Sequence, residues 1–320
     1  MTAAAIPEEL DLADVAPPDS VWRRALSDKR VAIGGGLLFI LLLTCVVTLP
    51  FTLNRTSNLY YDAQHASLAL KAPHVQTLWM AMGTSKLGQS LLGQSLVGGV
   101  ISLLIGLMAA AISVVLGLTV GVVAGYHGGW LDAVLMRIVD ILYALPYILL
   151  VILFKIALER PLGALLRSTI AANLAVLFLS IGLVSWLTMA RVIRGQVLSL
   201  RSLPFIEAAR AAGVPQLRIF TRHLLPNLVG PITVYATLTV PQAILQESLL
   251  SFLGIGIQRP LPTWGSLASD GLMLALNPVM SSWWLLVFPC TLLGVTLLAL
   301  NFVGDGLRDA LDPRRDGAKI

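Results

Sequence analysis

One segment of the sequence has the glycine and serine spacing of a phosphate-binding loop: residues 88–95 read GQSLLGQS. A working loop of that kind follows a strand and carries a lysine where Gln94 stands, because the ammonium group must reach the terminal phosphates. The four histidines lack the spacing of metal ligands, and Cys45 and Cys290 lie far apart in apolar runs. HExxH, GxSxG and paired intramembrane aspartates do not occur in the sequence. We therefore expect no catalytic residue, no metal site and no cofactor bound by this chain.

Charges inside apolar runs are the next candidates, because a charge at the centre of a bilayer costs ~3 kcal/mol or more and is usually functional or paired. Arg137 and Asp140 are three residues apart, so they can pair across one helical turn. Glu247 is expected near the outer end of its run, where it can face a cavity or a partner subunit, and the sequence leaves both open. Lys155 is expected to extend toward the interface. A structural pair is favoured over a substrate site for Arg137 and Asp140.

The polar segment from 199 to 227 predicts two short helices joined by a turn. Ser202 can cap the first helix, Pro204 fits its first turn, and Gly213 ends it. The second helix can start at Pro215 and is expected to break at Pro226, before the next apolar run. One face of the first helix carries small and apolar residues: Phe205, Ala208, Ala209 and Ala212. A loop that only connects two spans could be much shorter, and the alternative is an amphipathic segment lying on lipid headgroups.

The composition indicates a membrane protein. Hydrophobic residues make up 57% of the 320 positions and charged residues only 12%, against roughly 25% in soluble domains. The mean hydropathy is +0.83, which excludes a typical soluble enzyme. A span needs about 20 apolar residues, and six runs qualify: 31–51, 97–125, 135–157, 170–190, 229–250 and 285–304. The stretch 251–284 is rich in proline and tryptophan, so we expect an outer loop that lies on the membrane or re-enters it.

The basic residues predict the orientation. With six spans and a cytoplasmic N-terminus, 15 of the 22 lysines and arginines lie on the inner side, and six of these fall within 191–228. This bias predicts that both termini are cytoplasmic. It also explains the net charge of +5 without a nucleic-acid partner. The expected organisation is a cytoplasmic segment 1–30, a first span 31–51, an extracytoplasmic loop 52–96, a core 97–304 with five spans and a cytoplasmic loop 191–228, and a cytoplasmic tail 305–320.

Small residues recur at every fourth position of the second run, which predicts close packing against another helix. In lipid, helices associate through van der Waals contact, and small side chains let their backbones approach. The five positions are Ala109, Ser113, Gly117, Gly121 and Gly125.

The polar loop carries Glu207-Ala208-Ala209, then three residues and Gly213, and then Leu225-Pro226. This pattern resembles the EAA loop in the membrane subunits of bacterial ATP-binding-cassette (ABC) importers. Four further segments resemble the C-type subunit of that family's dipeptide and oligopeptide permease branch: AGYHGGWLDAVLMRIVDILYALP (124–146), ARVIRGQVLSL (190–200), LQESLLSFLGIGIQRPLPTWGSL (245–267) and NFVGDGLRDALDPR (301–314). The resemblance covers most of the chain from residue 97 onward.

One segment departs from the pattern of that branch. Residues 83–90 read GTSKLGQS, where the branch usually has Gly-Thr-Asp, two residues, and Gly-Arg-Asp. Ser85, Gln89 and Ser90 therefore replace three charged residues just before the second span.

The resemblance implies an all-α membrane protein with six transmembrane helices and the type I importer fold, placed in the bacterial inner membrane. It implies a non-catalytic permease subunit that translocates peptides and works with a second permease subunit, an extracytoplasmic binding protein and two cytoplasmic ATPases that bind ATP and Mg²⁺. Glu207 would lie near the ATPase, Ala208 and Ala209 would allow close approach, and Gly213 would make the turn. Leu225 and Pro226 would complete this coupling loop.

Two alternatives stay open at this point. Within the same importer type, the substrate can be nickel or another non-peptide solute. From another class, an ion-coupled secondary transporter would need carboxylates at the bilayer midplane or broken helices in paired halves, and the sequence shows neither. A membrane scaffold or enzyme without transport would leave the EAA-like loop unexplained.

Overall fold

The computed structural model describes residues 28–74, 76–257, 259–278 and 281–311. The predicted cytoplasmic segment 1–30 falls almost entirely outside these residues, as does the end of the tail predicted for 305–320. Within the described part, helices account for the regular structure, together with one isolated antiparallel bridge between Thr84 and Ser90. The elements in chain order are α2 (Lys29–Val47), α3 (Leu49–Thr52), η2 (Ala66–Leu68), η3 (Leu78–Met80), α4 (Leu91–His127), α5 (Gly129–Ala144), α6 (Tyr147–Leu165), α7 (Thr169–Arg201), α8 (Pro204–Ala211), α9 (Gln216–Ile219), η4 (Phe220–Leu224), α10 (Leu225–Phe252), α11 (Trp264–Ala275) and α12 (Trp284–Leu311).

Five stretches of helix are long and apolar enough to cross a membrane: α2, α4, α7, α12 and the continuous stretch Gln216–Phe252 that contains α10. They coincide with five of the six predicted spans. Several are longer than predicted. The 37 residues of α4 correspond to about 55 Å at 1.5 Å per residue, so this helix extends beyond a hydrocarbon layer of ~30 Å. At the C-terminus, α12 continues to Leu311, so residues 305–311 are helical.

The span predicted at 135–157 is broken in the structure. This region forms two helices, α5 and α6, which are bent by 101° at the break between them. Leu145 has an extended backbone, with φ −79° and ψ 146°, and it precedes Pro146. Proline lacks an N–H group and disfavours a helical conformation at the residue before it. The pair counts as a sixth span only if both halves are taken as one broken segment.

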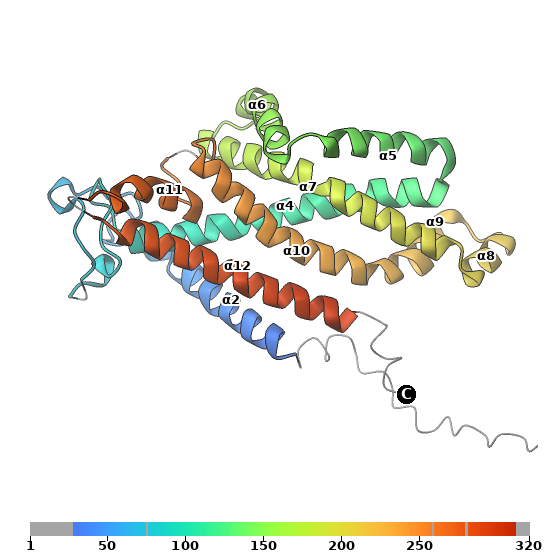
Figure 1. The fold of residues 1–320 in the computed structure, drawn as a ribbon, viewed down its shortest axis with the longest axis horizontal. Coiled ribbons are helices and arrows are strands. Elements are labelled where there is room, and N and C mark those ends of the chain that lie inside the picture. The colour runs from blue at the N-terminus through green and yellow to red at the C-terminus, as the bar shows by residue number, and fades with distance from the viewer. Residues whose placement is uncertain (1–27, 75, 258, 279–280, 312–320) are drawn as a thin grey trace, which may run out of the picture.

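The long helices form a bundle in which α4, α7 and α10 lie at the centre (Figure 1). The paired helices α2 and α12 pack on one side of this group, and α5 and α6 lie on the other side. One end of the bundle carries α11 and the segment 52–90, whereas the opposite end carries α8 and α9. Side chains of α4, α6, α7 and α10 form the largest buried cluster, with Ile105, Val151, Ile181 and Leu250 among its members.

The small residues of α4 pack against α7, as the sequence predicted. All five are buried. A Cβ atom added to Gly117 would lie 2.5 Å from the Cβ of Met189, and one added to Gly121 would lie 2.6 Å from the carbonyl oxygen of Ala190. Neither distance is tolerable for carbon, so the separation of the two helices depends on glycine at these positions.

Residues 251–284 were expected as an outer loop that lies on the membrane or re-enters it, and this stretch contains a helix, α11, that packs into the bundle. Thr263 caps α11: its side chain accepts a hydrogen bond from the N–H of Ser266, whose side chain accepts one from the N–H of Thr263. Trp264 is fully buried, and its Nε1 donates to the carbonyl oxygen of Ser95 at 2.9 Å. The segment therefore joins α4, α10 and α12 at this end.

We predict that Gly121→Leu will lower the stability of the folded subunit, because α4 and α7 must separate to admit the side chain. Overpacking of this kind costs about 1–3 kcal/mol. Thermal unfolding of the purified protein in detergent measures the effect. Gly36→Leu is the matched control, since a Cβ at Gly36 meets no atom within 4 Å. Equal melting temperatures for the two variants would contradict the proposed role of the glycine ridge.

Candidate coupling and translocation site

The loop between α7 and α10 forms the predicted helix–turn–helix. α8 ends at Ala211, and α9 begins at Gln216. Gly213 lies in the turn with φ +73°, a left-handed conformation that favours glycine. The turn is closed by two hydrogen bonds, from the N–H of Gly213 to the carbonyl of Arg210 and from the N–H of Val214 to the carbonyl of Ala209.

Three aliphatic side chains fix this helix–turn–helix to the bundle. Ile206, Ile219 and Leu224 are at most 1% exposed. They pack with Tyr126 at the end of α4 and Leu200 at the end of α7. The sequence interpretation missed Ile206, although large aliphatic residues on both short helices were a visible signal that the two helices share a buried face.

The outward surface of the loop is small and apolar around one carboxylate. Glu207, Ala208 and Gly213 are exposed, and a Cβ at Gly213 meets no atom within 4 Å. Phe205 is 45% exposed and Leu217 is 73% exposed. We call this surface the coupling surface, and it comprises Phe205, Glu207, Ala208, Ala212, Gly213 and Leu217.

Two details of the predicted first helix were wrong. Ala209 does not share the outward face, because it is half-buried and packs against the cluster around Ile206. Ser202 does not cap α8, because Leu203 occupies the N-cap position. The Ser202 hydroxyl instead donates to the carbonyl oxygen of Ser199 at 3.0 Å.

Pro226 does not break the chain, which was the third wrong expectation in this segment. Residues 220–224 form a π-helical turn, η4, in which the N–H of Leu225 bonds to the carbonyl of Phe220. Pro226 then lies in the first turn of α10, where a missing N–H group is tolerated. A continuous helical path therefore runs from the coupling surface into a membrane span.

Arg137 and Asp140 do not pair with each other, contrary to the sequence prediction. Asp140 instead accepts a hydrogen bond from Arg191 of α7 at 2.7 Å, and the Arg191 guanidinium lies 4.0 Å from the ring centre of Tyr143. Because α5 packs along α7, a long arginine side chain on α7 can reach the carboxylate across the helix contact. Arg137 is exposed and forms no ion pair with any residue in the described part of the chain.

A second ion pair joins the same two helices more tightly. Arg194 of α7 binds Asp132 of α5 through two parallel hydrogen bonds, Nε to Oδ1 at 2.5 Å and Nη2 to Oδ2 at 2.7 Å. The Asp132 side chain is only 14% exposed. Paired hydrogen bonds between a guanidinium and a carboxylate fix geometry as well as energy. The sequence interpretation did not identify this pair, since 62 positions separate its members.

Glu247 faces neither a cavity nor the exterior of the subunit. It is fully buried, and its Oε1 accepts hydrogen bonds from Ser251 and from Thr263, both at 2.7 Å. Thr263 is the N-cap of α11, so this carboxylate ties α10 to α11. Lys155, which was expected to extend toward the interface, donates from its Nζ to the carbonyl oxygens of Ile255 and Gly256.

A cavity of about 460 Å³ lies between α5, α6, α7 and α10, and we call it the central cavity. Its polar lining is uncharged, and the Tyr147 hydroxyl donates to Oε1 of Gln246 inside it. No acidic or basic residue is among the described residues that line it. Such a cavity can hydrogen-bond a polar solute without selecting its charge. The polar residues are Tyr143, Tyr147, Ser185, Thr188, Tyr235, Thr239, Gln242 and Gln246.

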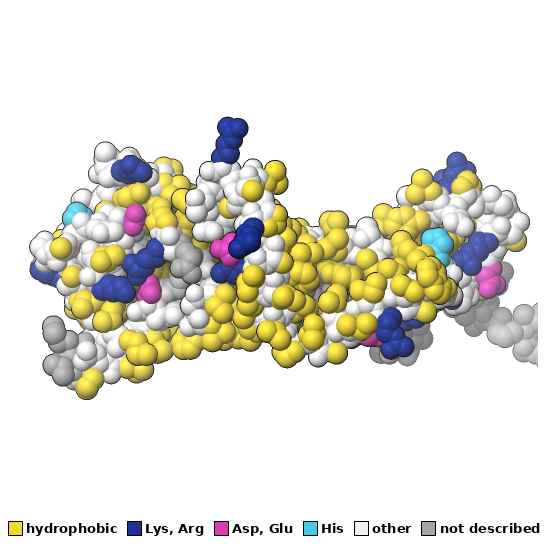
Figure 2. Space-filling view, turned by 90° about the horizontal axis from the view of Figure 1, so that it is seen from above, with side chains coloured by type: hydrophobic (Ala, Val, Ile, Leu, Met, Phe, Trp, Pro, Cys, Tyr) yellow, Lys and Arg dark blue, Asp and Glu magenta, His cyan; other side chains and the backbone are white. Residues whose placement is uncertain are grey.

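The side-chain distribution fits a membrane-embedded body. Figure 2 shows charged side chains near the two ends of the visible face and in one group between them, with hydrophobic side chains covering most of the stretch from that group toward the right-hand end. The helices α2, α5, α6 and α12 expose large apolar side chains, including Phe39, Ile141, Leu153 and Leu298. An exposed apolar band of this kind is stable only against lipid or another apolar subunit.

These features define a membrane subunit of an ABC importer. Residues 117–317 match the family described as "Binding-protein-dependent transport system inner membrane component". This region is more than half of the chain and includes the whole helix–turn–helix. The chain therefore belongs to that family and is a multi-pass protein of the cytoplasmic membrane.

Its curated relatives are similar along almost the whole length. The chain is 42% identical over 298 residues to the oligopeptide transport system permease protein OppC of Escherichia coli K12, with 92% of each chain covered. It is 39% identical to the dipeptide transport system permease protein DppC of Bacillus subtilis, with 92% of this chain and 84% of the relative covered. A solved chain of the inward-facing MetNI methionine ABC transporter aligns with a TM-score of 0.52 at 20% identity, over 67% of this chain and 94% of the other. The fold is thus the type I importer fold that the sequence resemblance implied.

We predict that Asp132→Ala will destabilise the subunit by about 1.5–3 kcal/mol, because the partly buried guanidinium of Arg194 loses a charge-assisted partner. Asp140→Ala is the control, since its side chain is 58% exposed, and such a pair contributes less than about 1 kcal/mol. Denaturant titration of each variant gives the free energy of unfolding. A larger loss for Asp140→Ala would show that the exposed pair, and not Asp132–Arg194, holds α5 to α7.

Proposed function

We propose that this chain is one of two different membrane subunits of an ATP-driven importer that carries peptides across the cytoplasmic membrane. The observation that carries the proposal is the similarity over 92% of the chain to permease proteins named for oligopeptide and dipeptide transport. The central cavity supports it, because neutral hydroxyl and amide groups can hydrogen-bond a peptide backbone whatever its side chains are. The chain supplies a path and carries out no chemistry.

The coupling surface is the proposed contact with an ATPase subunit. Ala208, Ala212 and Gly213 leave room for close approach, while Phe205 and Leu217 supply apolar area. Glu207 lies on the same surface and can pair with a basic group of the partner. ATP and Mg²⁺ would be bound by the two ATPase subunits, so nucleotide chemistry reaches this chain only as a displacement of α8 and α9.

The orientation follows from where this surface lies. Because α8 and α9 are at one end of the bundle, that end would be cytoplasmic, together with both termini. The excess of basic residues at this end agrees with the same orientation. The other end, with α11 and the segment 52–90, would then face outward and receive a substrate-binding protein.

The second membrane subunit would complete the path. The central cavity is open on one side, where residues such as Thr188 and Gln242 are exposed. A partner covering this side would enclose the solute between two subunits. In that arrangement Tyr143, Thr188 and Gln242 would face the path, whereas Glu247 would stay inside this subunit. Asp140 and Arg191 are three positions along the chain from Tyr143 and Thr188, and they pair with each other.

We predict that the assembled complex in liposomes will accumulate labelled trialanine when ATP is supplied to its ATPases and loaded binding protein is outside. Uptake of Ni²⁺ instead of peptide would contradict the peptide assignment and favour the nickel alternative. Uptake that follows an ion gradient and ignores ATP would favour the secondary transporter.

In the same assay, Gln242→Lys should slow uptake of a lysine-containing tripeptide more than that of trialanine. Gln242→Met should affect the uptake of the two peptides equally.

We predict that Gly213→Trp will separate ATP hydrolysis from transport while the subunit still inserts and assembles. In the isolated subunit a Cβ at Gly213 meets no atom within 4 Å, so we expect the obstruction to arise when an ATPase docks. Peptide uptake should fall at least tenfold with ATPase activity largely retained. Gly129→Trp is the matched control, because Gly129 has φ +59° and also has no atom within 4 Å of a built Cβ, so it carries the same backbone strain. Normal transport by Gly213→Trp would falsify the coupling assignment.

A further inference from the structure

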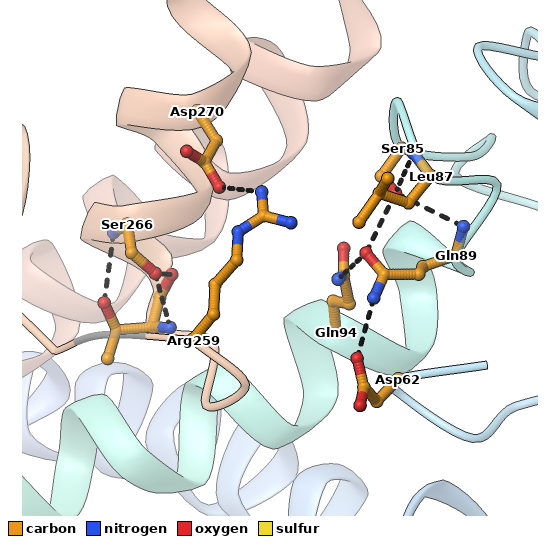
Figure 3. A network of polar contacts seen from close by, with 9 residues as sticks. Asp62, Ser85, Leu87, Gln89, Gln94, Arg259, Ser266 and Asp270 are labelled. Carbon is orange, nitrogen blue, oxygen red and sulfur yellow. Dashed lines mark hydrogen bonds and ion pairs between the residues drawn. The ribbon is translucent and has the colours of Figure 1, made fainter. Parts of the chain in front are cut away.

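A second cavity lies at the end of the bundle opposite to α8 and α9, between the segment 62–94 and residues 251–274. Its volume is about 560 Å³, which is within the range of small-molecule sites, roughly 300–1,000 Å³. One wall carries Asp62, Gln89 and Gln94, and the other carries Arg259 and Asp270. Figure 3 shows the two walls, with Gln94 on the side of its wall that faces Arg259. We call this space the Gln94 cavity.

Hydrogen bonds fix the direction of both amide side chains in the first wall. Asp62 is a carboxylate and only accepts, so the amide group that contacts its Oδ1 at 2.9 Å must be Nε2 of Gln89. Oε1 of Gln89 therefore points the other way and accepts from Nε2 of Gln94 at 2.9 Å. As a result, the Gln94 oxygen is turned away from this chain of hydrogen bonds.

The Gln94 oxygen has no hydrogen-bond partner among the described residues. The side chain lines the cavity, yet the residue is only 8% exposed. Buried polar atoms are almost always paired, and an unpaired one calls for a ligand or an ordered water. Since the atom is an acceptor, the missing group is a hydrogen-bond donor.

The charges around the cavity narrow the class of that donor. The cavity lining has two acidic side chains, Asp62 and Asp270, and two basic ones, Lys86 and Arg259. A ligand with one positive and one negative end can therefore find an oppositely charged side chain for each end. An ammonium group has three donors and suits the wall with Gln94 and Asp62. Arg259 uses Nη2 to bind Asp270 at 2.6 Å, and its guanidinium has further donors for a carboxylate.

We propose that the Gln94 cavity binds a short peptide in zwitterionic form, with its ammonium group at Gln94 and Asp62 and its carboxylate toward Arg259. This inference rests on the proposed function and names a substrate site that is separate from the central cavity. A peptide released at the outer end would bind here before it enters the path between the two membrane subunits. The neutral groups at Ser85 and Gln89 belong to this arrangement, because both line the cavity and Ser85 donates to Oε1 of Gln89 at 3.1 Å.

The test measures peptide binding to the assembled importer in nanodiscs, with no binding protein added. Calorimetry compares trialanine with N-acetyl-trialanine, which lacks the ammonium group, and with trialanine amide, which lacks the carboxylate. On the unmodified complex, acetylation should weaken binding at least tenfold, as expected for loss of a charge-assisted hydrogen bond. This comparison needs no variant, so it stands even where a substitution impairs folding.

Two variants then locate the site. Gln94→Leu keeps the size of the side chain and should raise the Kd of trialanine about tenfold. Gln64→Leu is the matched control, because Gln64 lines the same cavity but is exposed, and it should change the Kd less than about twofold.

Three results would overturn the inference: no binding of trialanine to the unmodified complex, equal binding of the acetylated peptide, or an unchanged Kd in Gln94→Leu. If Gln94→Leu instead weakens only the association of unloaded binding protein, the cavity is a docking site for that protein and the inference is wrong. Each of these results can occur while the unmodified complex imports peptide in liposomes, so the proposed function would survive. Failure of that import is a separate result.

Discussion

The close contact between α4 and α7 is the constraint on which the rest of the structure depends. Gly117, Gly121 and Gly125 bring the backbones of the two helices together, and this contact positions three other parts. Tyr126, directly after the ridge, lies under the helix–turn–helix. The chain then turns at Gly128 into α5, which lies along α7. A wider separation would therefore move the coupling surface and one wall of the central cavity at the same time.

Most of the polar and charged groups inside the bundle connect one helix to another through hydrogen bonds or ion pairs. Asp132 joins α5 to α7, Glu247 joins α10 to α11, and Lys155 joins α6 to the segment after α10. Each of these three side chains has a hydrogen-bond partner within the subunit, as low-dielectric surroundings favour, although Oε2 of Glu247 has none among the described residues. The central cavity is consequently left with neutral polar groups only, and this neutrality suits a path for solutes of varied charge.

The sequence was sufficient to predict the features that depend on local pattern. Apolar run length located five of the six spans, the small-residue spacing identified the α4 face that packs on α7, and the pattern of residues 199–227 located the helix–turn–helix between α7 and α10. It failed where distant residues decide the outcome. The partner of Asp140 is 51 positions away, and the Gln89 and Asp62 contact spans 27, so no local spacing could indicate either. The bend at Pro146 had a local signal in the proline itself, whereas apolar length indicated only that 135–157 could form a span.

The continuity of α7 explains how one displacement could act at two distant places. Its 33 residues run without a break, so Ser185 and Thr188 in the central cavity and Leu200 beneath α8 belong to one rigid element. The π-helical turn η4 similarly joins α9 to α10, which carries Gln242 and Gln246. The proposed ATPase contact would thus move two walls of the central cavity together. The third wall, α5, is tied to α7 by Arg191 and Arg194, so it would follow that movement, whereas α6, beyond the bend at Pro146, could lag behind it.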